Sequence, residues 1–162
     1  MSALYASTTP RASETAQIIG GKVGLAAQQR PALRVPDAGA AEGHVWADAR
    51  ERWPLDPHNL IRALPDDAEP WPTYLDRAAA DLDEILHQHL GGRIVIVGHT
   101  ETVSAMYAPL LGVHDLGRLK VDLGHCEVSV WRAVGEWPGA QHNSQRWSLR
   151  DLMSTKFTDL EL

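Results

Sequence analysis

Cysteine is nearly absent from this chain of 162 residues, and Cys126 is the only one. A single cysteine excludes a disulfide within the chain and favours a reducing compartment. The first residues lack the basic stretch and the long apolar core of a signal peptide, so we expect a cytoplasmic protein. No apolar stretch has the length needed to cross a membrane, and we therefore expect no membrane partner.

Runs of basic residues are also absent, and the formal net charge is −6. A nucleic-acid partner is therefore not expected. The chain has no internal repeat and no low-complexity tract. Its length and its 44% of hydrophobic residues fit one domain over residues 1–162, with a proline-rich insertion at about residues 53–72.

Motifs for metals and nucleotides are missing as well. The sequence has no zinc, P-loop or Rossmann motif and no nucleophile elbow. His125 and Cys126 are neighbours in an expected strand and would point to opposite faces. His87 and His89 do not share a helix face. We therefore expect neither a metal ion nor a cofactor.

Strand and helix patterns alternate along the chain. The clearest helix is Tyr74 to Leu90, where apolar residues recur at helical spacing before a glycine pair. The other expected helices are Pro10–Ile19 (ended by Gly20-Gly21), Val45–Arg52 and Thr100–Leu111, and the expected strands are Ala3–Ala6, Arg93–Val97, Glu127–Trp131 and Ser144–Leu149. Residues 29–43 are expected to be irregular. This alternation predicts an α/β layered fold with a largely parallel sheet.

Gly98-His99 follows the β-branched run Arg93–Val97, which is typical of a buried parallel strand. The segment from Thr100 to Leu111 is predicted to be a helix that stops at Gly112. His99 is therefore expected where a strand ends and a helix begins, the edge of an open α/β sheet at which ligands bind. A helix N-terminus there favours an anion. Taken alone, the pattern fits a polar loop residue equally well.

A second strand-turn-helix segment, Leu4 to Ala16, carries Arg11 at the start of its helix. With Gly98-His99 it resembles the histidine phosphatase superfamily, whose members have the phosphoglycerate mutase-like fold. In that family a strand ends in a serine-rich turn, and an arginine heads a helix that continues with Ala and a Thr-Ala pair. The second catalytic histidine of the family follows a buried strand, as His99 does. The matching residues of the first segment are Ser7, Arg11, Ala12, Thr15 and Ala16.

The middle of the chain is also similar to this family, so the resemblance covers nearly the whole sequence. Gly39, Glu42-Gly43 and the segment from Arg50 to Pro54 resemble the region after the family's acid residue. Arg77 stands where the long helix usually carries an arginine. The resemblance implies a three-layer sandwich with a mainly parallel sheet.

Two departures from the family pattern concern its catalytic groups. Family phosphatases and mutases carry an Arg-His-Gly motif on the first strand, and that histidine attacks phosphorus. Here no histidine precedes His44 and no Arg-His-Gly occurs, so we expect the first central strand and its nucleophile to be missing from these residues. Val35 stands four residues before Gly39, where the family usually has a glutamate. Valine cannot protonate a leaving alkoxide.

We expect the site to consist of two catalytic residues, His99 and Glu101, and three phosphate or anion ligands, Arg11, Ser7 and Thr100. Glu101 is the candidate proton donor, although a glutamate in the first turn of a helix is also favourable with the helix dipole alone. Asp37, Glu42 and His44 are weaker substitutes. A loop aspartate is typical of turn chemistry, the family match of Glu42 lies outside the reacting centre, and His44 is expected in an exposed loop.

Three tryptophans, Trp46, Trp53 and Trp71, flank the proline-rich segment. In the family this region folds over the site and helps to select the substrate. The three residues are therefore candidates for an apolar wall against an organic substrate. The alternative is that they fix a long loop to the core.

Loss of a central strand would leave backbone groups on its two neighbours without partners. Three explanations stay open. In the first, the native chain starts upstream and contains the usual histidine. In the second, the sheet closes over the gap. In the third, a second copy of the chain supplies a strand in a homodimer.

Three functions also stay open, because a fold does not fix a function. The first is a phosphomonoesterase-type enzyme for a small anionic or phosphorylated substrate, with Arg11 and His99 holding the phosphate and a nucleophile supplied from elsewhere. The second is an isomerase, cyclase or lyase that uses His99 as acid or base and Arg11 as a carboxylate clamp. The third is a noncatalytic binding or scaffold protein. We favour an enzyme.

Overall fold

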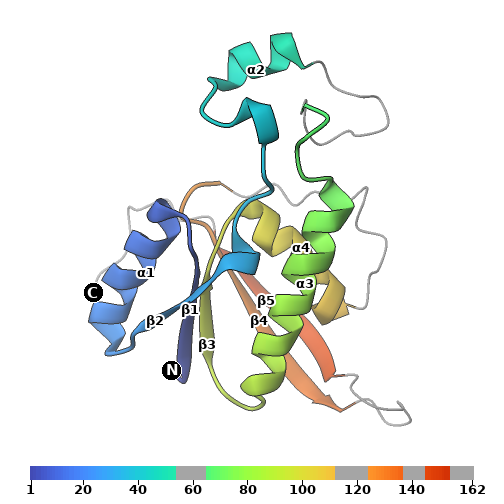
Figure 1. Cartoon of the computed structure of the whole chain (residues 1–162). Helices are drawn as coiled ribbons and strands as arrows, with labels where there is room; N and C mark the ends of the chain where they lie inside the picture. Colours follow the sequence, from blue (N-terminus) through green and yellow to red (C-terminus); the bar gives the residue numbers. More distant parts are fainter. Residues whose placement is uncertain (54–64, 112–123, 137–144, 154–162) are drawn as a thin grey trace.

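Strands and helices alternate in the computed structural model, which describes residues 1–53, 65–111, 124–136 and 145–153 (Figure 1). The elements are β1 (Ala3–Ser7), α1 (Pro10–Val23), β2 (Ala27–Arg30), η1 (Pro31–Leu33), η2 (Gly39–Ala41), α2 (Trp46–Arg52), α3 (Trp71–Gln88), β3 (Ile94–Val97), α4 (Thr100–Leu111), β4 (Val128–Glu136) and β5 (Gln145–Met153). The α/β class predicted from the sequence is confirmed.

The centre of the fold is a parallel sheet with the strand order β2-β1-β3. Leu4 of β1 stands opposite Ala27 on one side and Val95 on the other. Helix α1 covers one face of the sheet, and α3 and α4 cover the other (Figure 1). All five residues of β1 are buried because both faces are covered. The molecule thus has the expected three layers.

The main core lies between the sheet and α3, whose apolar residues fall on one face at helical spacing. Leu82 and Ile85 of this face are fully buried, and burial of each such side chain stabilises the fold by about 1.5–3 kcal/mol. The buried residues of the cluster are Ala3, Tyr5, Leu33, Trp71, Tyr74, Leu75, Ala78, Leu82, Ile85 and Ala105.

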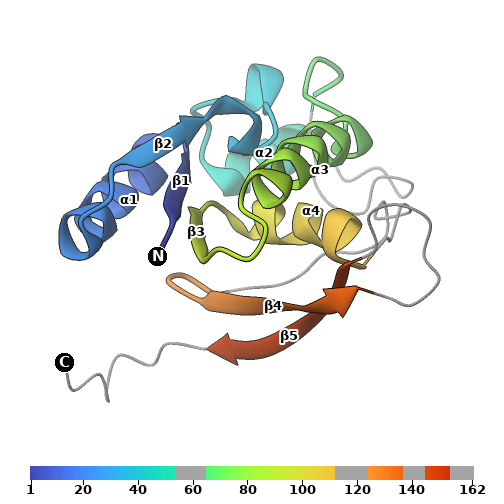
Figure 2. The same cartoon turned by 90° about the horizontal axis from the view of Figure 1, so that it is seen from below.

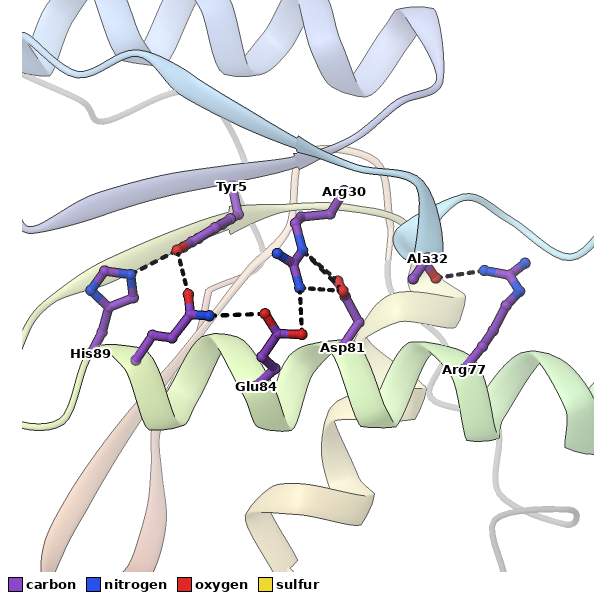
Figure 3. Close-up of polar contacts among 8 residues, drawn as sticks. Tyr5, Arg30, Ala32, Arg77, Asp81, Glu84 and His89 are labelled. Atoms are coloured by element: carbon purple, nitrogen blue, oxygen red, sulfur yellow. Dashed lines mark hydrogen bonds and ion pairs between the residues drawn. The ribbon is translucent and has the colours of Figure 1, made fainter.

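Polar contacts also hold α3 against the sheet (Figure 3). Arg30, at the end of β2, donates from Nε to both carboxylate oxygens of Asp81 at 2.9 and 3.0 Å. Its guanidinium also lies 3.2 Å from a carboxylate oxygen of Glu84. At the other end of the helix, the buried hydroxyl of Tyr5 lies 2.7 Å from Nε2 of His89. These contacts fix the position of α3 along the sheet.

Strands β4 and β5 form a separate antiparallel pair, as predicted for the C-terminal region (Figure 2). The ring of Tyr107 on α4 meets Trp131 of β4 edge-on, with centroids 5.4 Å apart. Within the described ranges β3 pairs with β1 alone. Its four residues are only half-buried, whereas the sequence predicts a buried strand. Among the described residues one edge of β3 has no neighbouring strand, which is consistent with this partial exposure.

Several predicted boundaries are wrong. Helix α1 continues through Gly20-Gly21 to Val23, and Gly24, with φ +71°, ends it. The end of strand β2 lies in a region that the sequence predicts to be irregular. Cys126, with φ +62°, is in a turn before β4 and not in a strand. The proline-rich insertion predicted at residues 53–72 lies mostly outside the described residues, and its far end begins α3.

Candidate active site

Two strand-to-helix junctions meet at the carboxyl edge of the sheet. β1 ends at Ser7 and α1 begins at Pro10, while β3 ends at Val97 and α4 begins at Thr100. β1 and β3 are paired in parallel, with Ala6 opposite Val97, so the residues after both strands lie at the same edge. Helix α2 lies beyond this edge (Figure 1).

His99 joins the two junctions through its Nε2 atom. This nitrogen lies 3.0 Å from Oγ of Ser7 and 3.1 Å from Oγ1 of Thr9. Both hydroxyl residues are buried, and the backbone N–H of Thr9 donates to Oγ of Ser7 at 3.3 Å. The structure therefore brings together Ser7 and His99, as the sequence predicts, and adds Thr9 to them.

Arg11 contacts the opposite nitrogen of the same ring. Its Nη2 atom lies 3.3 Å from Nδ1 of His99. A guanidinium can only donate hydrogen bonds, so Nδ1 must be the acceptor. With Nδ1 as the acceptor, a neutral ring would carry its proton on Nε2, within reach of the hydroxyls of Ser7 and Thr9.

The backbone before α4 fixes the orientation of His99. Its N–H donates to Oγ1 of Thr102 at 3.0 Å, which satisfies one of the free N–H groups at a helix start. A Cβ atom on Gly98 would lie 2.6 Å from the same Oγ1. Gly98 is therefore required by the close packing of this turn. Neither Thr9 nor Thr102 was identified as a site residue from the sequence, although the position of each at a helix start is a signal of such a role.

The site lies at the N-termini of two helices, α1 and α4, whose dipoles both favour an anion. The first turn of α1 contains no acidic residue, and Pro10 occupies its start. Thr100 is the first residue of α4, and its carbonyl accepts a hydrogen bond from Ser104 at 3.1 Å. The arrangement of Arg11, Thr100 and the two helix starts is suited to an oxyanion.

Glu101, the predicted proton donor, is half-buried in the first turn of α4. It is near enough to the fully buried Tyr74 to affect that residue electrostatically. Burial raises the pKa of Tyr74, and the charge of Glu101 acts in the same direction. Within the described residues the Tyr74 hydroxyl reaches no hydrogen-bond partner of good geometry, although Thr102 is close enough to lower the pKa in part.

The loop that carries Val35 is held by Arg77 of α3. The guanidinium donates to Oε1 and Oε2 of Glu69 at 2.6 and 2.7 Å. It also donates to the carbonyl oxygens of Ala32, Arg34 and Val35 (the first of these contacts is drawn in Figure 3). The hydrogen bond from Arg77 holds the pKa of Glu69 below its usual range. Arg77 therefore has a structural role in this loop.

The other substitutes lie in the same loop region. Oδ1 of Asp37 accepts the backbone N–H of Gly39 at 2.8 Å, which is the turn chemistry expected for a loop aspartate. Glu42 and His44 are exposed.

The three predicted wall tryptophans differ in their surroundings. Trp71 is buried in the core and stacks on Tyr74 with centroids 5.2 Å apart. Trp53 is half-buried and contacts the ring of His44 edge-on at 5.5 Å, with the guanidinium of Arg52 5.0 Å from its centroid. The side chain of Trp46 lies outside the described part. Trp71 thus has the packing role that was the alternative to a substrate wall.

The described residues contain no group of three or more His, Cys, Asp or Glu side chains that could hold a metal ion. Among the same residues, none of the helices combines the length and the hydropathy of a membrane span.

Comparison with known proteins gives a family and several relatives. Residues 1–147 match the profile of the histidine phosphatase superfamily (branch 1). A metal-independent phosphoserine phosphatase from Arabidopsis thaliana is 25% identical over 153 aligned residues, which cover 88% of this chain. The chain spans 63% of the length of that relative.

Two solved structures of similar fold are named as phosphatases. A mycobacterial glucosyl-3-phosphoglycerate phosphatase in complex with VO3 has a TM-score of 0.73 at 20% identity, covering 94% of this chain and 76% of that one. The alpha-ribazole phosphatase from Shigella flexneri has a TM-score of 0.60 at 19% identity, covering 93% and 72%. These likenesses support the fold. Because the family profile matches 147 of its 162 residues, the chain belongs to the histidine phosphatase superfamily.

Proposed function

We propose that this chain binds the phosphate of a small phosphorylated molecule, and that the phosphomonoester bond is hydrolysed at this site when a nucleophile is supplied from outside the 162 residues. The observation that carries the proposal is the cluster of Arg11, His99 and Ser7 at the start of two helices. Arg11 would supply a permanent cation with a planar fork of donors. Thr100 and the N–H groups of the helix starts would complete the shell around the oxyanion.

The relatives support phosphate as the ligand. The mycobacterial phosphatase has been solved with inorganic phosphate as well as with VO3, and the Arabidopsis relative is a phosphoserine phosphatase. We propose Glu101 as the proton donor to the leaving alkoxide, because it follows His99 closely and because Val35 has no proton to give. These relatives give no support to the isomerase, cyclase or lyase function or to a noncatalytic scaffold.

Thermal unfolding in the presence of inorganic phosphate or orthovanadate tests the binding. A ligand that binds the folded state at a concentration 100 times its Kd adds about 2.7 kcal/mol to the free energy of unfolding. We expect Arg11→Ala to lose most of this stabilisation, because a hydrogen bond to a charged group contributes about 1.5–3 kcal/mol.

Arg93→Ala is the matched control. Arg93 is exposed and precedes β3 at the opposite edge of the sheet, so its loss removes the same charge without touching the site. Equal stabilisation of wild type, Arg11→Ala and Arg93→Ala by phosphate would contradict the binding site. Hydrolysis of para-nitrophenyl phosphate that is lost in His99→Ala tests the reaction separately.

A further inference from the structure

A buried hydroxyl without a well-placed partner lies on the core side of the site. Tyr74 of α3 is fully buried, and its hydroxyl has no hydrogen-bond partner of good geometry among the described residues. A buried hydroxyl of this kind costs stability, because it loses its hydration and no full hydrogen bond replaces it. Trp71 stacks on its ring with centroids 5.2 Å apart, and the guanidinium of Arg77 lies 4.8 Å from the ring centroid. These two contacts fix the position of the hydroxyl.

The hydroxyl of Tyr74 has Thr102 as a neighbour in the first turn of α4. Helices α3 and α4 pack against each other (Figure 1), and Thr102 is buried. Burial raises the pKa of Tyr74, and hydrogen bonding from Thr102 opposes part of this effect, which is the action of a hydroxyl that donates to the phenol oxygen. Oγ1 of Thr102 also accepts the backbone N–H of His99 at 3.0 Å. Thr102 therefore connects the buried phenol to the backbone of His99.

Thr102 has an alternative side-chain conformation that would release His99. His99 directly precedes α4 and Thr102 is the third residue of the helix, so its oxygen reaches back to the N–H of the N-cap residue as in one half of a capping box. A threonine in a helix divides between two χ1 rotamers, because its hydroxyl can instead bond a backbone carbonyl one turn earlier. When two rotamers are both well populated, a weak contact from a neighbouring side chain is enough to select one of them.

We propose that Tyr74 is a positioning residue for His99, and that its phenol oxygen accepts the hydroxyl proton of Thr102 and so selects the rotamer whose Oγ1 holds the His99 N–H. The bonds run in one direction, from the His99 N–H to Oγ1 of Thr102 and from the Thr102 hydroxyl to the phenol oxygen. The inference rests on the proposed function, since the turn that is held in this way is the one at which phosphate would bind. The cost of the buried phenol is then offset by the order that it gives to the site.

Hydrogen exchange of the His99 backbone amide tests the inference, because this N–H is the group that Thr102 holds. NMR of the full chain labelled with 15N-histidine follows that signal directly. We expect Tyr74→Phe to speed its exchange by about 2- to 10-fold, the range that corresponds to the loss of one ordinary hydrogen bond. Thr102→Val, which has a similar shape but no oxygen, should do the same. Tyr107→Phe, at a half-buried tyrosine further along α4, is the matched control and should exchange like wild type.

A double-mutant cycle identifies the route. If Tyr74 acts through Thr102, the variant with both Tyr74→Phe and Thr102→Val should exchange no faster than Thr102→Val alone. The Kd of inorganic phosphate, measured by thermal unfolding, should rise in the same non-additive way. Tyr74→Phe should nevertheless be at least as stable as wild type without phosphate, whereas a merely structural role predicts a loss of stability.

The outcomes separate this inference from the proposed function. Exchange of the His99 amide at the wild-type rate in Tyr74→Phe would overturn the inference. Additive effects of Tyr74→Phe and Thr102→Val would overturn it as well, and so would coupling of Tyr74→Phe to Glu101→Gln in place of Thr102→Val. If phosphate stabilises neither wild type nor any variant, the proposed function fails, while the amide exchange rates still decide whether Tyr74 positions His99.

Discussion

At the scale of single residues, Gly98 decides where His99 lies. An added Cβ atom would be 2.6 Å from Oγ1 of Thr102, which also accepts the His99 N–H. We expect Gly98→Ala to destabilise the fold by about 1–3 kcal/mol, as overpacking does, and to weaken phosphate binding. The control is Gly21→Ala in α1, which has no atom within 4 Å of the added Cβ and should gain about 0.4–1 kcal/mol. Urea unfolding with and without phosphate measures the free energy of unfolding and the stabilisation by phosphate of each variant. A Gly98→Ala protein as stable as Gly21→Ala would contradict the packing argument.

Tyr74 predicts a stability loss at alkaline pH. Its pKa is raised in the folded state, chiefly by burial, above the ordinary value of 10.0. Below that value both states keep the proton, and its contribution to stability is fully present. As pH rises further only the unfolded chain loses the proton, so stability falls by about 1.4 kcal/mol per pH unit until the folded pKa is reached.

Tyr74→Phe should remove this part of the pH dependence. It should also raise stability at neutral pH by about 1 kcal/mol, because the hydroxyl is buried without a well-placed partner among the described residues. Urea unfolding at about pH 9 and about pH 11 compares the variant with wild type and with Tyr107→Phe, at a half-buried tyrosine. If the free energy of unfolding fell equally between the two pH values for wild type and Tyr74→Phe, the expected titration of Tyr74 would be contradicted.

The sequence predicts the residues of the site better than their partners. Arg11, Ser7 and His99 could be found because each follows a strand pattern at the start of a helix. Thr9 and Thr102 could not, because their roles depend on how closely two turns that are about 90 residues apart approach each other. The burial of Trp71 likewise depends on how α3 packs in the core and could not be predicted from the sequence.

At the scale of elements, α3 holds the loop beside the site through Arg77. The guanidinium makes a fork with Glu69 and reaches the carbonyl oxygens of Ala32 and Arg34. We expect Arg77→Lys to lower the free energy of unfolding by about 1–3 kcal/mol, because an ammonium group cannot reproduce the fork. Urea unfolding measures the change, with the exposed Arg93→Lys as the matched control. Similar unfolding midpoints for the two variants would contradict this role.

The first and last residues of a helix or strand can be predicted well where the pattern of apolar and polar side chains alone determines them. Helix Thr100–Leu111 has the expected limits. Helix α1 passes the expected stop because a glycine costs only about 1 kcal/mol inside a helix, and Gly20 packs close to Leu4 and Leu25. Strand β2 could not be predicted because its sequence, AQQR, has no apolar alternation, and its pairing with β1 supplies the order.

At the scale of the whole molecule, the sheet ends at β3 on the side where β4 and β5 form a pair of their own (Figure 2). An open edge in the sheet of these 162 residues could be predicted, because the sequence contains no Arg-His-Gly segment. Whether two edges far apart in the sequence pair across the gap could not be predicted, because it depends on how closely the fold brings them together. Within the described residues the edges do not pair, and Val128 and Val130 of β4 remain 45% and 42% exposed.

We propose that a second copy of the chain covers this open edge in solution. A strand of β-branched apolar residues with one open edge, as β3 has among the described residues, favours pairing with another chain. Identical chains assemble most often as two-fold dimers. Light scattering over a range of concentrations should therefore detect a dimer. Val130→Lys should shift it to monomer by adding a charge beside the edge. Val45→Lys, at a valine that is 67% exposed in the loop before α2, should remain dimeric. A wild-type chain that is monomeric at every concentration, or equal dissociation of the two variants, would show that the open edge is not a dimer interface.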